Sequence, residues 1–473
     1  MMAGFSRNFK SISANTVQFV INQVLGLLIF YVLSTNLTKN DFGRLNWALA
    51  VILTAFSILS CGIDQLAVKR IAEDDDTPNI MNLYIWHVLI TGALFYLTII
   101  GSYFLFSGSK IIIALLLGLG LGKMLNYFST PLKQLANAKE RFALLAKMSA
   151  VANVVKGLGL FIALLLHAIT LKFIVAIFVI GDVCELLATV ILYIKYLKVN
   201  IKVRWNRQQY VNLLKQALPQ IGVILFSSAL ARFDWIFIGL YLPAPKLAEY
   251  SFAYKAFEIS TMPLLVIAPL LVPKFVNILK THTQVPAKIF EWLQAELIIA
   301  FGAAIVLNLC WSPLVDAITS HKYGAVNKQV VFLLSMCGPV LYVNNFLWSI
   351  NFAHGRMKFI LKVFAITFFI NLVGDVWLIQ VWGNVGAAAA FLIATIVQGI
   401  MYCTSIKEVA SKISLSFIVS LVCALISMMA ASYIFNNVVA STAFGMAIYL
   451  ILLFITRTLN KEKLSMLKSF TTV

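Results

Sequence analysis

Apolar runs long enough to cross a lipid bilayer follow one another along almost the whole chain, with short polar breaks between them. A spanning helix needs about 20 mostly apolar residues, and we count about fourteen such runs. The predicted spans are 13–36, 45–68, 82–106, 111–132, 148–167, 173–194, 218–241, 251–272, 291–316, 329–353, 359–381, 385–403, 413–435 and 439–456. Twelve spans are the alternative, if the last two runs do not cross separately. The pattern predicts an all-α polytopic membrane protein.

The composition agrees with this fold class and argues against a soluble protein, and the motifs argue against an enzyme. Of the 473 residues, 61% are hydrophobic and 12% are charged, whereas a soluble protein has roughly half its residues apolar and about a quarter charged. The connections between spans are too short to hold a separate soluble domain. The chain has no HExxH motif and no recognisable pair of nucleophile and base, so we do not expect an enzyme.

The net charge of +19 comes from 37 Lys and Arg against 18 Asp and Glu. In a soluble protein this excess would suggest nucleic acid as a partner. With both termini in the cytoplasm, however, about 26 cations fall on the cytoplasmic side and about seven on the outer side, as the positive-inside rule requires. The charge therefore indicates the orientation in the membrane, and we do not expect a nucleic-acid partner.

Four cations lie inside the predicted spans, where a charge costs roughly 2.5 to 3.5 kcal/mol and usually faces a cavity or a partner. They are Lys123, Lys156, Arg232 and Lys255. Together they could form a cationic cleft for an anionic diphosphate, which an arginine would hold with two donors and a lysine as a point charge. The alternative is that each cation neutralises an acid in the membrane. Lys255 has Glu258 three residues away, on the same helical face.

Three acids in the spans are candidates for ion or proton coupling. Asp182 and Glu185 are three residues apart and share a helical face, so two ionised carboxylates would repel and one could carry a proton. The alternative for this pair is an ion pair with Lys123 or Lys156. Asp234 is the third candidate, because its side chain cannot share a face with Arg232, two residues before it.

Other acids lie nearer the ends of the predicted spans, where we expect them to reach water: Asp64, Glu291, Asp316 and Asp375. The histidines show no HxxxH or HxxE arrangement on one helix. We therefore expect no metal site and no cofactor.

Two segments suggest that the chain is built from two similar halves. Residues 136–142 (ANAKERF), after the fourth span, parallel residues 353–359 (AHGRMKF), after the tenth. The segments lie six helices apart with the same orientation, which predicts two parallel six-helix lobes followed by two further helices. The predicted boundaries are 1–210 for the first lobe, 211–408 for the second, and 409–473 for the last two helices and a basic tail.

Several short motifs resemble those of the polysaccharide-repeat flippases of the Wzx type. Residues 41–43 (DFG) follow the first span, and Asn371 precedes 383–390 (GNVGAAAA), similar to the family's Asn, then Gly-x-x-Gly-Ala-Ala, pattern. The motifs around the seventh span are residues 218–220 (LPQ), 232–234 (RFD), 239–242 (GLYL) and 250–253 (YSFA). The resemblance covers most of residues 13–405. The proline that usually precedes the late glycine motif is absent, with Gln380, Val381 and Trp382 in its place.

This resemblance implies membership of the superfamily of multidrug and toxin exporters and lipid II flippases, with two lobes in a V around a central cavity. It implies an alternating-access flippase that moves an oligosaccharide on undecaprenyl diphosphate from the inner to the outer leaflet of the bacterial inner membrane. The sugar is an O-antigen or similar repeat unit, and a polymerase and other polysaccharide-assembly proteins are the expected partners. A proton or sodium gradient could drive it. The alternatives are a cation-coupled exporter of small molecules and a lipid II flippase.

Overall fold

The computed structural model describes residues 22–73, 76–105, 110–199, 204–217, 232–264, 271, 275 and 288–459, and the regular structure in these ranges is helical. The chain divides into two compact units. The first comprises Met1–Gly239 and Pro243–Ala248, and the second comprises Leu240–Leu242 and Glu249–Val473. The predicted lobe boundaries after residues 210 and 408 stay a prediction.

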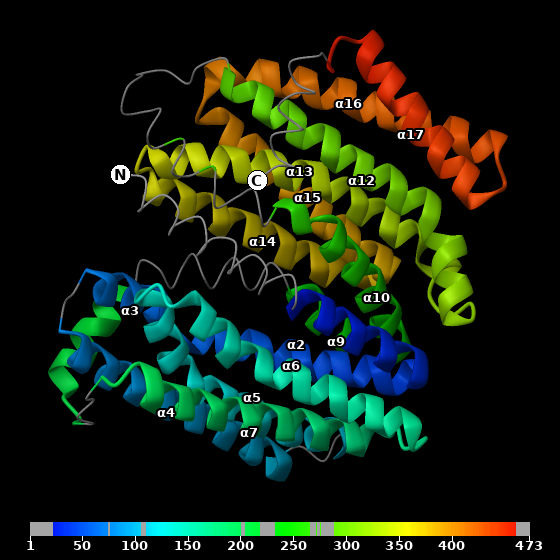
Figure 1. The fold of residues 1–473 in the computed structure, drawn as a ribbon. Helices are drawn as coiled ribbons and strands as arrows, with labels where there is room; N and C mark the ends of the chain where they lie inside the picture. The colour runs from blue at the N-terminus through cyan, green and yellow to red at the C-terminus, as the bar shows by residue number, and fades with distance from the viewer. Residues whose placement is uncertain are drawn as a thin grey trace. The chain divides into compact units, whose positions relative to one another are not determined.

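The first unit is built around α5, which packs against α2, α3, α4, α6 and α7 (Figure 1). Unlabelled helical turns also cover residues 22–36 and 207–217. The labelled helices are α2 (Lys39–Leu59), α3 (Ile63–Ala72), α4 (Thr77–Leu105), α5 (Lys110–Ala138), α6 (Phe142–Leu165), α7 (Leu171–Tyr196) and α9 (Phe233–Tyr241), which ends in the second unit.

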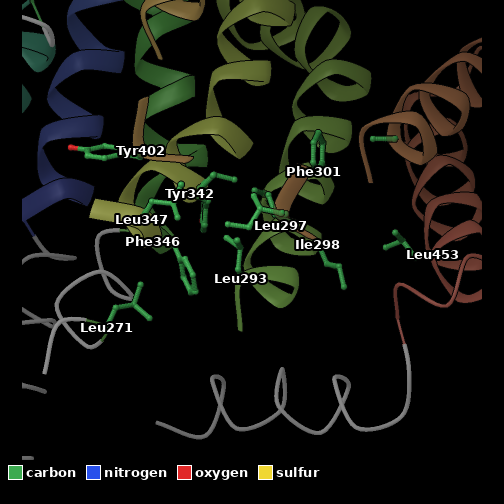
Figure 2. Packing of buried hydrophobic residues seen from close by; sticks show 14 of the residues in the cluster. Leu271, Leu293, Leu297, Ile298, Phe301, Tyr342, Phe346, Leu347, Tyr402 and Leu453 are labelled. Atoms are coloured by element: carbon green, nitrogen blue, oxygen red, sulfur yellow. The ribbon is translucent and has the colours of Figure 1, made fainter. Parts of the chain in front are cut away.

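In the second unit, α12 packs against α13, α16 and α17, and α15 packs against α13 and α14. The apolar side chains between these helices form one buried cluster, part of which is drawn in Figure 2. The helices are α10 (Ala244–Ser260), which begins in the first unit, α12 (Lys288–Thr319), η1 (Ala325–Asn327), α13 (Lys328–Ala353), α14 (Met357–Trp382), α15 (Asn384–Thr404), α16 (Lys407–Ile434) and α17 (Val438–Ile455).

Eleven helices in the described ranges are long and apolar enough to cross a membrane, and each overlaps one predicted span. The last two predicted runs form the separate helices α16 and α17. The predicted spans 13–36, 218–241 and 251–272 lie partly outside the described residues. The multi-pass, all-α fold class is confirmed, and the total of fourteen stays a prediction.

The predicted second span, 45–68, is wrong at its end. α2 stops at Leu59, and α3 begins after a turn in which Cys61 and Gly62 both have left-handed backbone conformations, with φ of 49° and 71°. Two such residues in succession cannot continue a right-handed helix. The sequence does not mark this break clearly. Cys61 and Gly62 continue the apolar run, and Cys61 is not a residue type that usually adopts a left-handed backbone.

The predicted repeat can be compared at the joints that connect α5 to α6 and α13 to α14. In the first joint the Arg141 amide donates to the Ala136 carbonyl at 2.9 Å. In the second joint the Arg356 amide donates to the Asn351 carbonyl at 3.0 Å. Both bonds span five residues, and the residue before each arginine has a left-handed backbone. The two joints therefore have the same backbone design.

The arginine side chains in the two joints also make the same contact. Arg141 Nη1 donates to the Tyr196 carbonyl at the end of α7 at 2.8 Å. Arg356 Nη1 donates to the Ser405 carbonyl at the end of α15 at 2.9 Å. The predicted alignment paired Arg141 with Lys358, and this register is wrong by two residues. Small and aromatic residues guided that alignment, whereas the equivalent feature is the arginine that ties each joint to a helix end.

Candidate functional site

A buried ion pair joins α6 and α7 in the first unit. Lys156 Nζ lies 2.6 Å from Asp182 Oδ1, and these two residues are 4% and 1% exposed. Lys123 of α5 reaches the same oxygen, with its Nζ at 3.6 Å. Asp182 therefore lies between two lysines from two different helices. This is the pairing that the sequence analysis kept as the alternative for Asp182.

A second ion pair lies within one turn of the first, between Glu185 of α7 and Lys133 of α5. Lys133 Nζ also lies 3.4 Å from Asn126 Oδ1. The sequence analysis missed this residue, because the predicted fourth span ended at residue 132 and Lys133 counted as a loop cation. α5 continues to Ala138 with Pro131 inside it. Lys133 directly follows the predicted span end, and a cation in that position is a signal that could have identified it.

Two glycines allow the helices to approach at this network. A Cβ atom on Gly122 of α5 would lie 2.9 Å from Asp182 Oδ2. A Cβ atom on Gly181 of α7 would lie 2.8 Å from Lys156 Cγ and 3.1 Å from the Ala152 carbonyl oxygen. All three distances are too short for ordinary contacts. Gly122 and Gly181 are therefore positions of close helix packing.

The network carries one excess positive charge, because three lysines face two carboxylates. Its members differ in accessibility: the side chain of Lys123 is 24% exposed, whereas that of Lys156 is 5% exposed. Phe178 covers Lys156, whose Nζ lies 5.1 Å from the ring centroid. Lys123 is thus the member of the network best placed to meet an anionic group outside the helix bundle.

The other predicted site residues have different surroundings. Arg232 lies in the turn before α9, with its guanidinium 5.0 Å from the ring centroid of Trp235. Asp234 is buried in the first turn of α9, and its Oδ1 accepts a hydrogen bond from the Trp235 amide at 2.8 Å. Lys255 of α10 pairs with Glu258, Nζ to Oε2, at 2.6 Å. This confirms the self-pairing that the sequence offered as an alternative for Lys255.

Two acids expected to reach water are instead buried. Asp375 of α14 is fully buried and accepts a hydrogen bond from Asn371 Nδ2 at 2.8 Å. Asp316 of α12 accepts bonds from the amides of Gly324 and Ala325 at 2.7 and 2.9 Å. The expectation was wrong for Asp316 because α12 continues three residues past the predicted span end. For both acids, amide donors from nearby residues replace water.

The sequence analysis did not single out Glu296, which lies on α12 and is fully buried. Within the described ranges, neither of its carboxylate oxygens has a hydrogen-bond partner. The residue falls inside the predicted span 291–316, so its position in an apolar run was the available signal.

No group of three or more His, Cys, Asp or Glu side chains could hold a metal ion in the ranges that the structure describes. Buried His87 is held by two hydrogen bonds: Nε2 donates to the Leu59 carbonyl at 2.8 Å, and Nδ1 shares a hydrogen bond with the Tyr210 hydroxyl at 2.9 Å. These bonds tie α4 to the end of α2 and to the segment 207–217. His87 therefore has a packing role.

Glycines of the short sequence motifs occupy positions where no side chain fits. A Cβ atom on Gly386 of α15 would lie 2.0 Å from the Leu378 carbonyl oxygen of α14. A Cβ atom on Gly43 of α2 would lie 1.9 Å from the Ala244 carbonyl oxygen of α10. Gly383, between α14 and α15, has φ of 58° and ψ of −134°, which favours glycine. The glycines in these motifs are therefore explained by close contacts between backbones.

The sequence model of the polysaccharide biosynthesis protein family matches residues 9–279, more than half of the chain. The chain belongs to this family. The match includes the α5–α7 charge network and the DFG motif at residues 41–43. No curated protein matches the chain in sequence.

Solved structures of transporters share the fold. The lipid II flippase MurJ in an inward closed conformation matches with a TM-score of 0.74 and 15% identity, over 93% of this chain and 98% of that one. An inward-facing multidrug resistance transporter of the MATE family and MOP superfamily has a TM-score of 0.63 and 13% identity, over 84% and 99%. A MOP superfamily transporter from Pyrococcus furiosus, whose structure is described by a binding pocket of reverse polarity, matches with a TM-score of 0.60 and 10% identity. The match covers 86% of this chain and 96% of that one. This family member therefore has a MurJ- and MATE-like membrane fold.

Proposed function

We propose that the protein is a flippase that moves an oligosaccharide linked to undecaprenyl diphosphate from the inner to the outer leaflet by alternating access. The family match over residues 9–279 carries this proposal. The likeness to the lipid II flippase MurJ supports a membrane transporter fold suited to such a cargo. The cargo is a surface polysaccharide repeat unit, of the O-antigen or a related type.

The charge network in the first unit supports an anionic cargo. A diphosphate carries negative charge, and the excess positive charge of the network would attract it most strongly where Lys123 is accessible. Arg232, half-buried before α9, is the second residue proposed to contact the diphosphate. Lys156 is better suited to hold Asp182 than to meet a ligand, since it is buried in its ion pair.

The proposed location is the bacterial inner membrane, with both chain termini in the cytoplasm, as the cation distribution predicts. Membrane lipids surround the apolar helix faces. Glycosyltransferases supply the lipid-linked substrate and a polymerase consumes the flipped product, so these proteins are the proposed partners.

Export of surface glycan in a strain lacking its own flippase tests the function. Lys123→Ala leaves the 2.6 Å pair of Lys156 with Asp182 in place, so the fold should survive. We expect export to fall by about tenfold or more, the loss for one charged hydrogen-bonding contact. Lys123→Arg should keep most of the export, and Lys172→Ala, an exposed lysine on α7, should have no effect.

Two results would contradict the proposal. Normal export by Lys123→Ala and Arg232→Ala together would show that these cations do not bind the cargo. A wild-type protein that leaves glycan export unrestored but removes cationic drugs from cells would favour the small-molecule exporter. The excess positive charge counts against that alternative, because it would repel a cationic drug.

A further inference from the structure

Glu296 has an unusual environment among the buried acids. Its side chain is fully buried on α12, and neither carboxylate oxygen has a hydrogen-bond partner among the residues that the structure describes. Its neighbours on the same helix, Leu293 and Leu297, belong to the apolar cluster shown in Figure 2. Tyr342 of α13 lies close enough to interact with it electrostatically, and the Tyr342 hydroxyl is also buried.

The unpaired state limits what this carboxyl group can be. An ionised carboxylate without a donor or a cation is very costly in an apolar interior, and such a group becomes neutral instead. A bound metal ion would need several oxygen ligands around it. Among the described residues, the Tyr342 hydroxyl lies near Glu296, but no group of three or more His, Cys, Asp or Glu side chains could hold a metal ion. A proton satisfies the carboxylate with no further ligand.

We propose that Glu296 is the proton-binding site that couples transport to the proton gradient. This inference rests on the proposed transport function and adds its energy source. The acids first considered for this role are less suitable, because Asp182 and Glu185 already neutralise lysines. A carboxylate held by a lysine gains little from a proton, whereas Glu296 must take one each time it returns to this buried position.

The surrounding titratable groups leave Glu296 as the group that exchanges protons near neutral pH. Among the described residues, burial and not a nearby charge governs the environment of Glu296. The buried cluster around it contributes phenols and a thiol, from Tyr342 of α13, Tyr402 of α15, Cys423 of α16 and Tyr449 of α17. Such groups are neutral at pH 7, since their ordinary pKa values are about 8.5 to 10.

The first test needs no substrate. Infrared spectra of the purified full-length protein in lipid nanodiscs at about pH 7 should contain the carbonyl band of a protonated carboxylic acid. The band should be lost in Glu296→Gln, whose amide has the shape of the neutral acid and should preserve the fold. Glu291→Gln, on the same helix and half-buried, is the matched control and should keep the band. Identical spectra for wild type and Glu296→Gln would overturn the proposal.

The second test measures coupling. Glu296→Gln should insert normally but lose glycan export in cells, and in proteoliposomes lipid-linked oligosaccharide transport should no longer respond to a pH gradient. Undiminished, gradient-sensitive transport by this variant would overturn the proposal. So would a response to sodium at constant pH that disappears in Glu296→Gln, because the coupling ion would then be sodium. If the proposed cargo is wrong, wild type itself fails to transport it, while the infrared result still stands.

Discussion

At the scale of single residues, Asp182 connects α5, α6 and α7 of the first unit through its charge. It is the shared partner of Lys156 and Lys123, and its Oδ2 lies against Gly122. A buried ion pair contributes little net stability, but removal of one member leaves the other charge buried and uncompensated. The acid and the lysines are therefore not equivalent targets for mutation.

We predict that Asp182→Asn destabilises the protein more than Lys156→Met does. The first change leaves two lysines without their carboxylate, at a cost of about 3 to 5 kcal/mol for an unpaired buried charge. The second leaves Asp182 with Lys123 at 3.6 Å. Thermal melting of the purified variants in one detergent measures the difference, and equal melting temperatures would contradict the predicted asymmetry.

Sequence reasoning identified the members of this network only in part. Spacing placed Asp182 and Glu185 on one face, and span position marked Lys123 and Lys156, but no sequence rule assigned partners across helices. Lys133 and Glu296 were missed for different reasons. A span boundary set six residues too early excluded Lys133, and nothing in the sequence shows that Glu296 faces the packed interior without a donor.

At the scale of elements, the joints between α5 and α6 and between α13 and α14 use an arginine in the same way. Each arginine satisfies a carbonyl at the end of a helix that the joint does not connect directly. Carbonyls at helix ends have no intrahelical donor, so a cationic donor is favourable there. The joint thus fixes the end of one helix against the start of another.

We predict that Arg141→Ala and Arg356→Ala each lower stability by about 1 kcal/mol, the usual net value of an exposed charged hydrogen bond. The two losses should be similar, because the two bonds have similar lengths. Lys358→Ala serves as the control. It replaces the exposed residue that sequence alignment wrongly equated with Arg141, and it should leave the melting temperature unchanged. A loss for Lys358→Ala as large as that for Arg356→Ala would contradict this account.

At the scale of the whole molecule, the positive-inside pattern and the eleven described crossing helices predict a definite orientation. Two exposed lysines on opposite predicted sides can report it: Lys139 follows α5, and Lys172 begins α7. In a chain without its native cysteines, Lys172→Cys should react with a membrane-impermeant maleimide added to intact cells. Lys139→Cys should react only after the membrane is opened, and the reverse pattern would show the opposite orientation.

The positions of the eleven described crossing helices were largely predictable, because apolar length is a local property of the sequence. Helix ends were less predictable. The break after Leu59 depends on a left-handed Cys61, and the extension of α5 passes through Pro131, so both departures run against residue preference. The glycine motifs indicated a family, and the structure gives their physical reason at Gly43 and Gly386.

The α5–α6 and α13–α14 joints give two examples of the same turn within one chain. Within residues 138–142 and 353–357, the shared letters are an alanine and the arginine three residues after it, yet the turns are alike. At the left-handed position one copy has Glu140, with φ of 54°, and the other has Gly355, with φ of 71°. Each joint is thus a natural variant of the other, and exchanging their sequences would separate what the turn requires from what each half has merely inherited.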